Sequence, residues 1–318
     1  MVNRELPNSY AIETTGLTKY YGQQITAVEN LNLSVKKGEI FSLLGPNGAG
    51  KTTTIKMLCC LSSPSFGSAT IMGKDVVKDS SAVKGLINLS PQETAVAGHL
   101  SIIENLVLMG RVYGLDRQTA RKRSTKLIKL MDLSERTNDT VKKLSGGLMR
   151  RLSIAMALIS NPQVLFLDEP TLGLDPKSRK RLWAIIQRLK GYKTVLLTTH
   201  YLEEADALSD RLAIIDQGRL IAVGSSEELK QRLGSMQSMT LKTENMSRAV
   251  YEKVKALYPV ATISRQGLKI EAKAIVFEDV AELLRSNGVK ITWVSMYEPT
   301  LDDVYLDVVK GGLKNENV

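Results

Sequence analysis

The sequence predicts an α/β fold with a core of parallel strands, an antiparallel β subdomain and a helical subdomain, followed by a small α+β domain. Three observations support this prediction. A glycine-rich stretch lies between an apolar run and a helical pattern at residues 39–61. Short apolar runs bounded by polar residues, such as 164–167 and 195–198, are typical of buried parallel strands. After residue 238, alternating strands are interspersed with helical patterns.

The length and composition of the chain are those of a globular protein with two domains. With 318 residues, 43% of them hydrophobic, it has room for a large domain and a smaller unit. We expect the large domain at residues 9–233, with its helical subdomain at about 93–160, and the smaller one at 238–318. A linker at residues 234–238 joins them.

Neither a membrane span nor a secretion signal is evident. No stretch approaches the roughly 18 consecutive apolar residues of a transmembrane helix. The first eight residues include Arg4 and Glu5 and lack the apolar region of a signal peptide. We therefore expect a cytosolic protein that contacts a membrane only through a partner.

Antiparallel strands are expected before the core begins. Apolar and polar side chains alternate through residues 10–35, and the chain turns at Lys36-Lys37-Gly38. The first core strand follows at residues 40–44, where the side chains have buried-strand character.

The glycine-rich stretch that follows this strand, Gly45-Pro-Asn-Gly-Ala-Gly-Lys-Thr52, has the spacing of a phosphate-binding loop. Its glycines allow the backbone N–H groups to approach a polyphosphate, and the helix that begins there adds its positive N-terminal end. Lys51 can reach the β- and γ-phosphates, and Thr52 can bind Mg²⁺. The residues expected to bind nucleotide here are Gly45, Pro46, Asn47, Gly48, Ala49, Gly50, Lys51, Thr52 and Thr53.

Helical patterns dominate the middle of the chain. A strand at residues 69–72 and a core strand at 86–89 precede them, and the core strand ends just before Gln92. Helices are expected at residues 102–113 and 117–131, and a third begins after Leu144-Ser-Gly-Gly147.

Positive charge is concentrated in this helical region. The formal net charge of the chain is +10. Residues 111–151 contain twelve Lys and Arg against four Asp and Glu, a local net charge of +8. Such a surface could meet nucleic acid, acidic lipid or an acidic protein, or could simply be a solvated helical face.

The next core strand, at residues 164–167, ends in two carboxylates. In an open α/β sheet, the carboxyl ends of the strands present the ligand-binding groups. Asp168 is therefore the predicted partner of Mg²⁺, and Glu169 the predicted base for an attacking water. The remaining elements of this domain are a helix at residues 179–189, strands at 195–198, 211–216 and 220–223, and a helix at 225–233.

The C-terminal region has the predicted order β-α-β-β-α-β, which suggests a ferredoxin-like unit with one added helix at residues 300–309. RNA-recognition domains share this order, but the strand at residues 268–272 lacks their stacking aromatic side chains. The sequence therefore gives little support to RNA binding by this domain.

The motifs of the large domain, in their order, resemble those of the ABC ATPases. The Leu-Ser-Gly-Gly run lies between the phosphate loop and the Asp-Glu strand, as the signature of that family does. The resemblance covers residues 10–233. Further matches are Gln92 to the Q-loop, Asp175 to the D-loop, His200 in Thr-Thr-His to the switch histidine, and Tyr21 in Lys-Tyr-Tyr-Gly to the aromatic that stacks on adenine.

This resemblance implies a homodimer that binds two ATP molecules at its interface. The signature residues are too far along the helical lobe to reach the nucleotide of their own phosphate loop. Ser145, Gly146 and Gly147 would then contact the γ-phosphate bound by the other copy. The implied catalytic residues are Lys51, Gln92, Glu169 and His200, and the implied Mg²⁺ ligands are Thr52, Gln92 and Asp168.

One position departs from the family pattern and indicates a subfamily. Leu148 stands where most members have glutamine, and exporter ATPases of the drug-resistance type often carry an apolar residue there. Residues 104–114 and 298–305 are also similar to the daunorubicin-resistance type. The resemblance implies an ATP-hydrolysing exporter motor, for a drug, lipid, ion or polysaccharide, on the cytoplasmic face of the membrane and coupled to an integral-membrane permease.

The alternative is a soluble ABC ATPase that acts on nucleic acid, in translation or repair. The basic residues 111–151 favour it. The single uninterrupted cassette, with no inserted coiled coil and no cysteine metal site, favours the transport motor and argues against nucleic acid as a partner.

Overall fold

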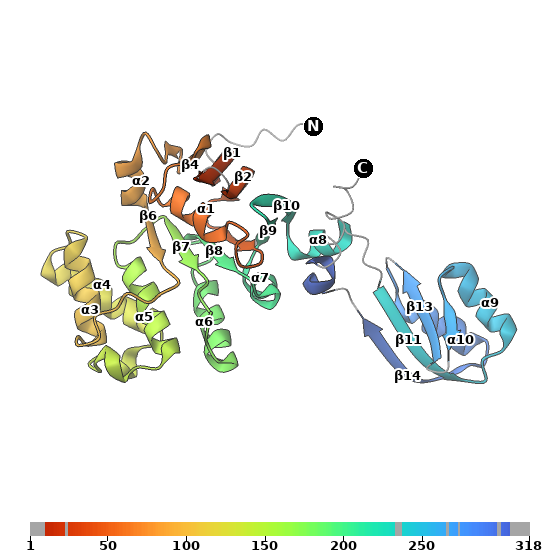
Figure 1. Ribbon diagram of the computed structural model, residues 1–318. Coiled ribbons are helices and arrows are strands. Elements are labelled where there is room, and N and C mark those ends of the chain that lie inside the picture. Colours follow the sequence, from red (N-terminus) through yellow and green to blue (C-terminus); the bar gives the residue numbers. More distant parts are fainter. Residues whose placement is uncertain are drawn as a thin grey trace. The chain divides into compact units, whose positions relative to one another are not determined.

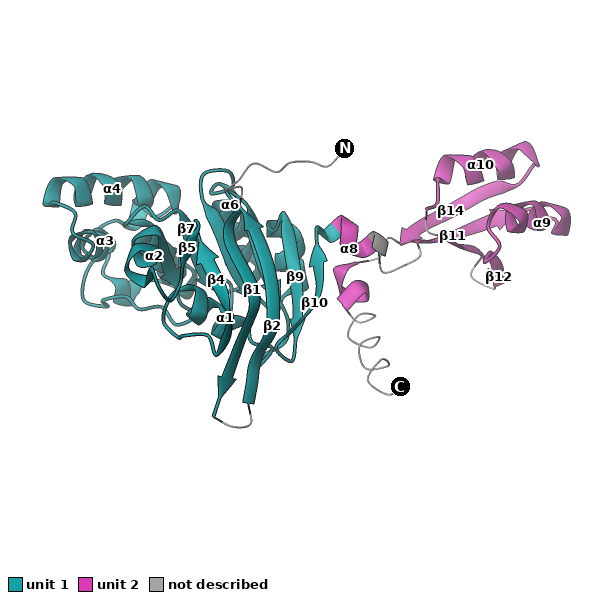
Figure 2. Ribbon diagram, turned by 90° about the horizontal axis from the view of Figure 1, so that it is seen from above, with its two compact units in different colours: residues 1–226 teal, residues 227–318 magenta. Residues whose placement is uncertain are grey.

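A computed structural model describes residues 10–22, 25–232, 237–264, 267–272, 274–297 and 300–305. The chain divides into two compact units, residues 1–226 and 227–318, each of which is described by itself (Figure 2). Most of the predicted linker at residues 234–238 lies outside the described residues.

A six-stranded sheet forms the centre of the first unit, in the order β10-β9-β3-β8-β7-β6 (Figure 1). Strand β3 pairs in parallel with β8 and β9, and β7 pairs in parallel with β8 and β6. Only β10 is antiparallel to its neighbour. The bounds are β3 Ile40–Leu44, β6 Ile87–Ser90, β7 Val164–Asp168, β8 Thr194–Thr199, β9 Arg211–Asp216 and β10 Arg219–Gly224.

Both faces of this sheet are covered, as parallel strands require. Every residue of β3, β7 and β8 is buried, and alternate side chains enter opposite cores. Phe166 packs in a cluster with Phe41 and Ile55, whereas Leu165 and Leu167 pack in a second cluster. The predicted parallel core is confirmed.

The first of these clusters lies between the central sheet and a four-stranded antiparallel sheet with the order β2-β1-β4-β5. Helix α1 (Lys51–Leu58), which follows the glycine-rich loop, contributes Ile55 and Met57 to the same core. The strands are β1 Tyr10–Tyr21, β2 Ile25–Lys36, β4 Phe66–Ile71 and β5 Lys74–Asp75.

The second cluster unites the central sheet with the helical region. Helices α3, α4 and α5 gather on one side of the unit, and α5 packs on both of the others (Figure 1). Two predicted helices end one residue early, at Val112 and Leu130. These helices are α3 Ile102–Val112, α4 Arg117–Leu130, α5 Gly146–Leu158 and α6 Pro176–Gln187.

Two short α-helices in the described part of the chain were not predicted. They are α2 (Ser80–Leu86) and α7 (Leu202–Leu208), of seven residues each. Seven residues make only about two turns, so a helical repeat is hard to distinguish in the sequence.

The second unit contains a four-stranded antiparallel sheet in the order β12-β13-β11-β14. Helices α9 and α10 share its core, in which Leu241 and Ile270 pack with Val254 and Leu284. The elements are α8 Ser226–Arg232, which spans the division between the units, β11 Gln237–Glu244, α9 Arg248–Leu257, β12 Thr262–Ser264, β13 Gly267–Ala272, α10 Phe277–Ser286 and β14 Lys290–Tyr297. Residues 301–305 of the predicted final helix are helical, and 306–309 lie outside the described residues.

Within the described part of the chain, no helix combines the length and the apolar character that a membrane crossing needs.

Candidate nucleotide-binding site

A cavity of about 450 Å³ opens beside the start of helix α1. Gln92 reaches it from the loop after β6, and Glu169 and His200 from the ends of β7 and β8. The structure thus brings four predicted parts of the site to one place. The lining residues are Ile25, Thr26, Ala27, Pro46, Asn47, Gly48, Gly50, Lys51, Thr52, Thr53, Gln92, Glu169, Leu172 and His200.

The phosphate loop is shaped by its own chain. Gly50 has a φ of +97°, in the left-handed region, and caps the start of α1. A Cβ atom there would lie 2.3 Å from the carbonyl oxygen of Ala27, so no other residue fits without a backbone shift. The loop therefore requires glycine at position 50 independently of any ligand.

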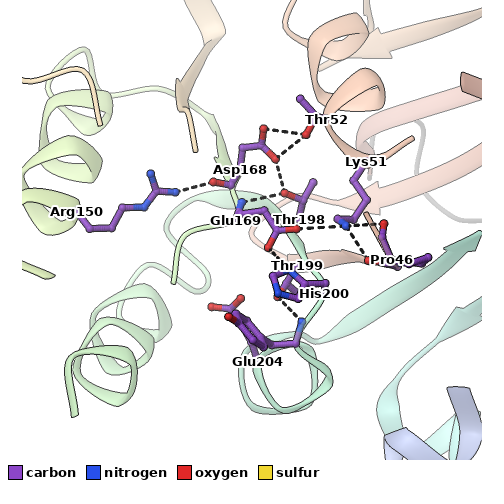
Figure 3. Close-up of polar contacts among 12 residues, drawn as sticks. Pro46, Lys51, Thr52, Arg150, Asp168, Glu169, Thr198, Thr199, His200 and Glu204 are labelled. Atoms are coloured by element: carbon purple, nitrogen blue, oxygen red, sulfur yellow. Dashed lines mark hydrogen bonds and ion pairs between the residues drawn. The ribbon is translucent and has the colours of Figure 1, made fainter. Parts of the chain in front are cut away.

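Lys51 is buried at the centre of the site. Its Nζ donates hydrogen bonds to the carbonyl oxygens of Gly45 at 2.7 Å and Pro46 at 3.0 Å, and lies 3.2 Å from Oε1 of Glu169 (Figure 3). All its partners are acceptors. Phosphate oxygens, which are also acceptors, could therefore replace these groups as partners of the ammonium.

Asp168 faces the first turn of α1. The Thr52 hydroxyl donates to its carboxylate at 3.1 and 3.3 Å, and the Thr198 hydroxyl donates at 2.5 Å. Thr52 and Asp168 thus place a hydroxyl and a carboxylate oxygen together beside the phosphate loop. Mg²⁺ favours one or two carboxylates together with substrate phosphates, so these oxygen atoms fit such an ion. Among the described residues, no cluster of three or more His, Cys, Asp or Glu is placed to bind a metal without the phosphates.

Glu169 has an unusual backbone conformation. Its φ is +45°, which residues other than glycine seldom adopt. The Thr198 hydroxyl accepts a hydrogen bond from its N–H at 3.0 Å. Its Oε2 lies 2.8 Å from Nδ1 of His200, while Oε1 faces Lys51 (Figure 3). The carboxylate is therefore held between the two groups expected to meet the phosphates.

Two residues of this network were missed in the sequence. Thr198 is the first residue of the Thr-Thr-His run that identified His200, and it connects Asp168 with Glu169. Arg150 lies within the Leu144 to Arg151 run and donates to the carbonyl oxygen of Asp168 at 2.6 Å. Both stand inside motifs already recognised, but hydroxyl and guanidinium contacts with distant backbone are not visible in a sequence.

The signature segment does not line this cavity. Ser145 and Gly146 are exposed at the start of α5, and Gly147 is half-buried. Ser145 occupies the N-cap position, yet its side chain makes no capping hydrogen bond. The structure therefore does not support the ordinary explanation of this serine as a helix cap.

Asp175 caps helix α6. Its carboxylate accepts hydrogen bonds from the N–H groups of Lys177 at 3.1 Å and Ser178 at 3.0 Å. The Ser178 hydrogen bonds hold the pKa of this carboxyl below its usual range. Asp175 does not line the cavity, so its predicted contact with nucleotide stays a prediction.

Tyr21 is 41% exposed and is also not among the cavity-lining residues, although Ile25, Thr26 and Ala27 of the next strand are. The ammonium of Lys19 lies 5.3 Å from the centre of the Tyr21 ring. Residues 23–24, which join the two strands, lie outside the described residues, and stacking of Tyr21 on adenine stays a prediction.

Comparison with known proteins agrees with this geometry. The pattern of the family described as "ABC transporter" matches residues 28–172. The chain is 41% identical over 303 residues to the daunorubicin/doxorubicin resistance ATP-binding protein DrrA of Streptomyces peucetius, covering 93% of this chain and 91% of that relative. The chain belongs to the ABC transporter family.

A further relative and a solved structure support the assignment. The linearmycin resistance ATP-binding protein LnrL of Bacillus subtilis is 35% identical over 311 residues, covering 96% of this chain and all of the relative (100%). A dimeric, post-hydrolysis structure of the ATP-binding cassette MJ0796 bound to ADP and Pi superposes with a TM-score of 0.60 at 28% identity, covering 67% of this chain and 98% of that chain. The protein is thus an ABC ATPase that binds and hydrolyses ATP.

Proposed function

We propose that this ABC ATPase is the motor of an exporter, that it works as a head-to-tail homodimer with two ATP molecules at the interface, and that a separate membrane permease carries the cargo. One observation carries the dimer. Lys51, Glu169 and His200 converge on one cavity, whereas the exposed Ser145 and Gly146 do not reach it. A second copy supplies the missing side of each site.

The catalytic roles follow from the contacts. When ATP enters, Lys51 exchanges the carbonyl oxygens of Gly45 and Pro46 for phosphate oxygens, and its ion pair with Glu169 weakens. Glu169 then accepts a proton from the water that attacks the γ-phosphorus, and the bond from this phosphorus to the β,γ-bridging oxygen breaks to give ADP and phosphate. His200, which pairs with Glu169 in this structure, donates to the γ-phosphate when ATP is bound. Gln92 transmits the state of the site to the permease.

Mg²⁺ is the proposed companion of ATP. Thr52, Asp168 and Gln92 would hold it, together with phosphate oxygens, and the ion would offset the negative charge of the phosphates. Thr198 maintains the orientation of Asp168 toward Thr52, because its hydroxyl donates to the same carboxylate.

The names of these relatives support export as the direction of transport. DrrA is named for resistance to daunorubicin and doxorubicin, and LnrL for resistance to linearmycin, which fits the removal of a compound from the cell. Coupling to a permease would place the protein on the cytoplasmic face of the membrane. Residues 238–318 would form a ferredoxin-like accessory domain, supported by the order β12-β13-β11-β14, and residues 9–233 the cassette.

The test is Glu169→Gln. A general base typically contributes about 10²- to 10⁴-fold, so the variant should hydrolyse ATP at most about 1% as fast as the wild type. Glutamine keeps the shape of the side chain and removes a negative charge near the γ-phosphate, so ATP binding should survive. Size-exclusion chromatography with Mg-ATP should therefore show a dimer for Glu169→Gln, and a monomer without nucleotide.

The matched control adds Ser145→Arg to the same protein. The longer side chain would block the opposing γ-phosphate without touching the chain's own cavity, so the double variant should bind ATP but elute as a monomer. A Glu169→Gln protein that stays monomeric at saturating Mg-ATP, alone and with its permease, would contradict the shared-site proposal. A dimer that forms equally well without nucleotide would also contradict it.

A further inference from the structure

Arg150 contacts the main chain on both sides of Glu169 and does not line the cavity. It belongs to helix α5, is only 4% exposed, and donates hydrogen bonds to main-chain carbonyl oxygens of two separate loops. Nη2 donates to Asp168 at 2.6 Å and Nε donates to Pro170 at 2.9 Å. Nη1 donates to Gln92 at 3.2 Å and also to Pro91. One side chain thus joins helix α5 to two loops of the site.

Two of these bonds flank the strained residue of the site. The carbonyl groups of Asp168 and Pro170 belong to the residues on either side of Glu169, whose φ is +45°. A left-handed conformation of a non-glycine residue persists only where surrounding contacts determine it. Arg150 fixes the chain before and after Glu169, and the Thr198 hydroxyl fixes its N–H group.

The charge of Arg150 suits this role. Burial lowers the pKa of the guanidinium to about 10, while the carboxylates of Asp168, Glu204 and Glu169 oppose the shift. The group therefore stays charged at neutral pH, and it can serve several carbonyl groups at once through its planar fork of N–H donors. A lysine at this position would keep the charge but could not span both loops.

We propose that Arg150 is a positioning residue, which holds the Glu169 backbone so that its carboxylate faces the attacking water and ties it to the Gln92 loop. This inference rests on the proposed role of Glu169 as the base. It assigns to α5 a second task besides presenting Ser145. The same rigid helix presents a group to the partner's ATP and holds the base of its own site.

The adjacent Arg151 offers a matched control. It is 9% exposed, lies on the same helix, and donates to the carbonyl oxygens of Met131 and Asp132 at 3.0 Å each, away from the cavity. Replacing either arginine removes a buried cation and its hydrogen bonds from α5. Of the two arginines, only Arg150 contacts the segments that contain Gln92 and Glu169.

We therefore compare Arg150→Met, Arg150→Lys and Arg151→Met by steady-state ATP hydrolysis. Misplacing a reacting group by about 1 Å can cost about 10²-fold, so kcat of Arg150→Met should fall by roughly that factor while KM for ATP changes by less than about threefold. Arg150→Lys should recover part of the loss. Arg151→Met should keep kcat within about threefold of the wild-type value, even if its thermal unfolding temperature falls as far as that of Arg150→Met.

A double variant separates positioning from general damage. In a Glu169→Gln background, Arg150→Met should lower the residual single-turnover hydrolysis far less than it lowers hydrolysis in the wild type, because the base it positions is already gone and only its contact with the Gln92 loop is lost. An equal loss in both backgrounds, or a normal kcat for Arg150→Met, would overturn the proposal. Should Arg150→Met not fold, Arg150→Lys carries the same comparison.

The two proposals fail in different ways. If Glu169→Gln hydrolyses ATP as fast as the wild type, the role of Glu169 is wrong. If Glu169→Gln is inactive and the Arg150 variants are normal, only the role of Arg150 is wrong.

Discussion

The phosphate loop and the signature segment both place glycines at the N-terminal end of a helix, yet they differ in how many contacts they make with their own chain. In the loop, Lys51 has three acceptors from the same chain, and the Thr52 hydroxyl donates to Asp168. In the signature segment, the Ser145 side chain makes no capping bond. The polar side chains of the phosphate loop thus find partners within the chain, whereas the Ser145 side chain caps no helix.

One glycine from each segment shows the same contrast. A Cβ atom on Gly50 would lie 2.3 Å from a carbonyl oxygen, but one on Gly146 would meet nothing within 4 Å. Packing within the chain explains Gly50 and leaves Gly146 unexplained. The open space beside Gly146 leaves room for the contact of the proposed dimer.

The largest expected effect comes from removing the lysine of the phosphate loop. Lys51→Ala removes the buried cation that lies 3.2 Å from Glu169 and faces the phosphate-binding loop. Nucleotide affinity should fall by about 10²-fold or more, since a charged hydrogen-bond donor to the phosphates is lost. Titration with a fluorescent ATP analogue measures this, and an unchanged dissociation constant would refute the assignment of the loop.

The next effect should separate the two regions. Gly146→Ala adds one methyl group where the single chain has open space, so folding and ATP binding by the monomer should be unchanged. In the dimer the methyl would crowd the γ-phosphate bound by the partner, so kcat should fall by about tenfold or more. This loss should be smaller than the loss of about 10²- to 10³-fold that follows removal of a complete charge-stabilising donor. Isothermal titration calorimetry tests ATP binding by the monomer, and a steady-state assay tests the fall in kcat. Hydrolysis at the wild-type rate would mean that Gly146 does not face phosphate.

The smallest effect is expected at Leu148, where this chain departs from the family pattern. Its side chain is half-buried and packs against the core of the helical region. In Leu148→Gln, the proposed phosphate contacts from Ser145 and the helix amides remain. ATPase activity should stay within about threefold, compared with the about 10²-fold loss on removing a true donor. A collapse of activity would show that Leu148 packs in the dimer interface.

Local sequence order was sufficient for much of this protein. The loop, the Asp168-Glu169 pair and the Thr-Thr-His run are contiguous motifs, and the apolar runs between them predicted the parallel strands that the structure contains. In a parallel sheet the carboxyl ends of neighbouring strands meet at one edge. The convergence of Lys51, Glu169 and His200 on one cavity agrees with this geometry, but the tertiary structure decided that β3, β8 and β7 are neighbours.

Contacts between segments distant in the chain were decided only by the tertiary structure. Arg150 reaches carbonyl groups 58 and 59 residues earlier in the chain and 18 and 20 residues later, and Thr198 reaches the carboxylate of Asp168, 30 residues before it. Carbonyl acceptors are present at every residue, so no sequence pattern marks which ones a buried donor will meet. The positive φ of Glu169 is equally invisible, because it is maintained by these contacts rather than by local preference.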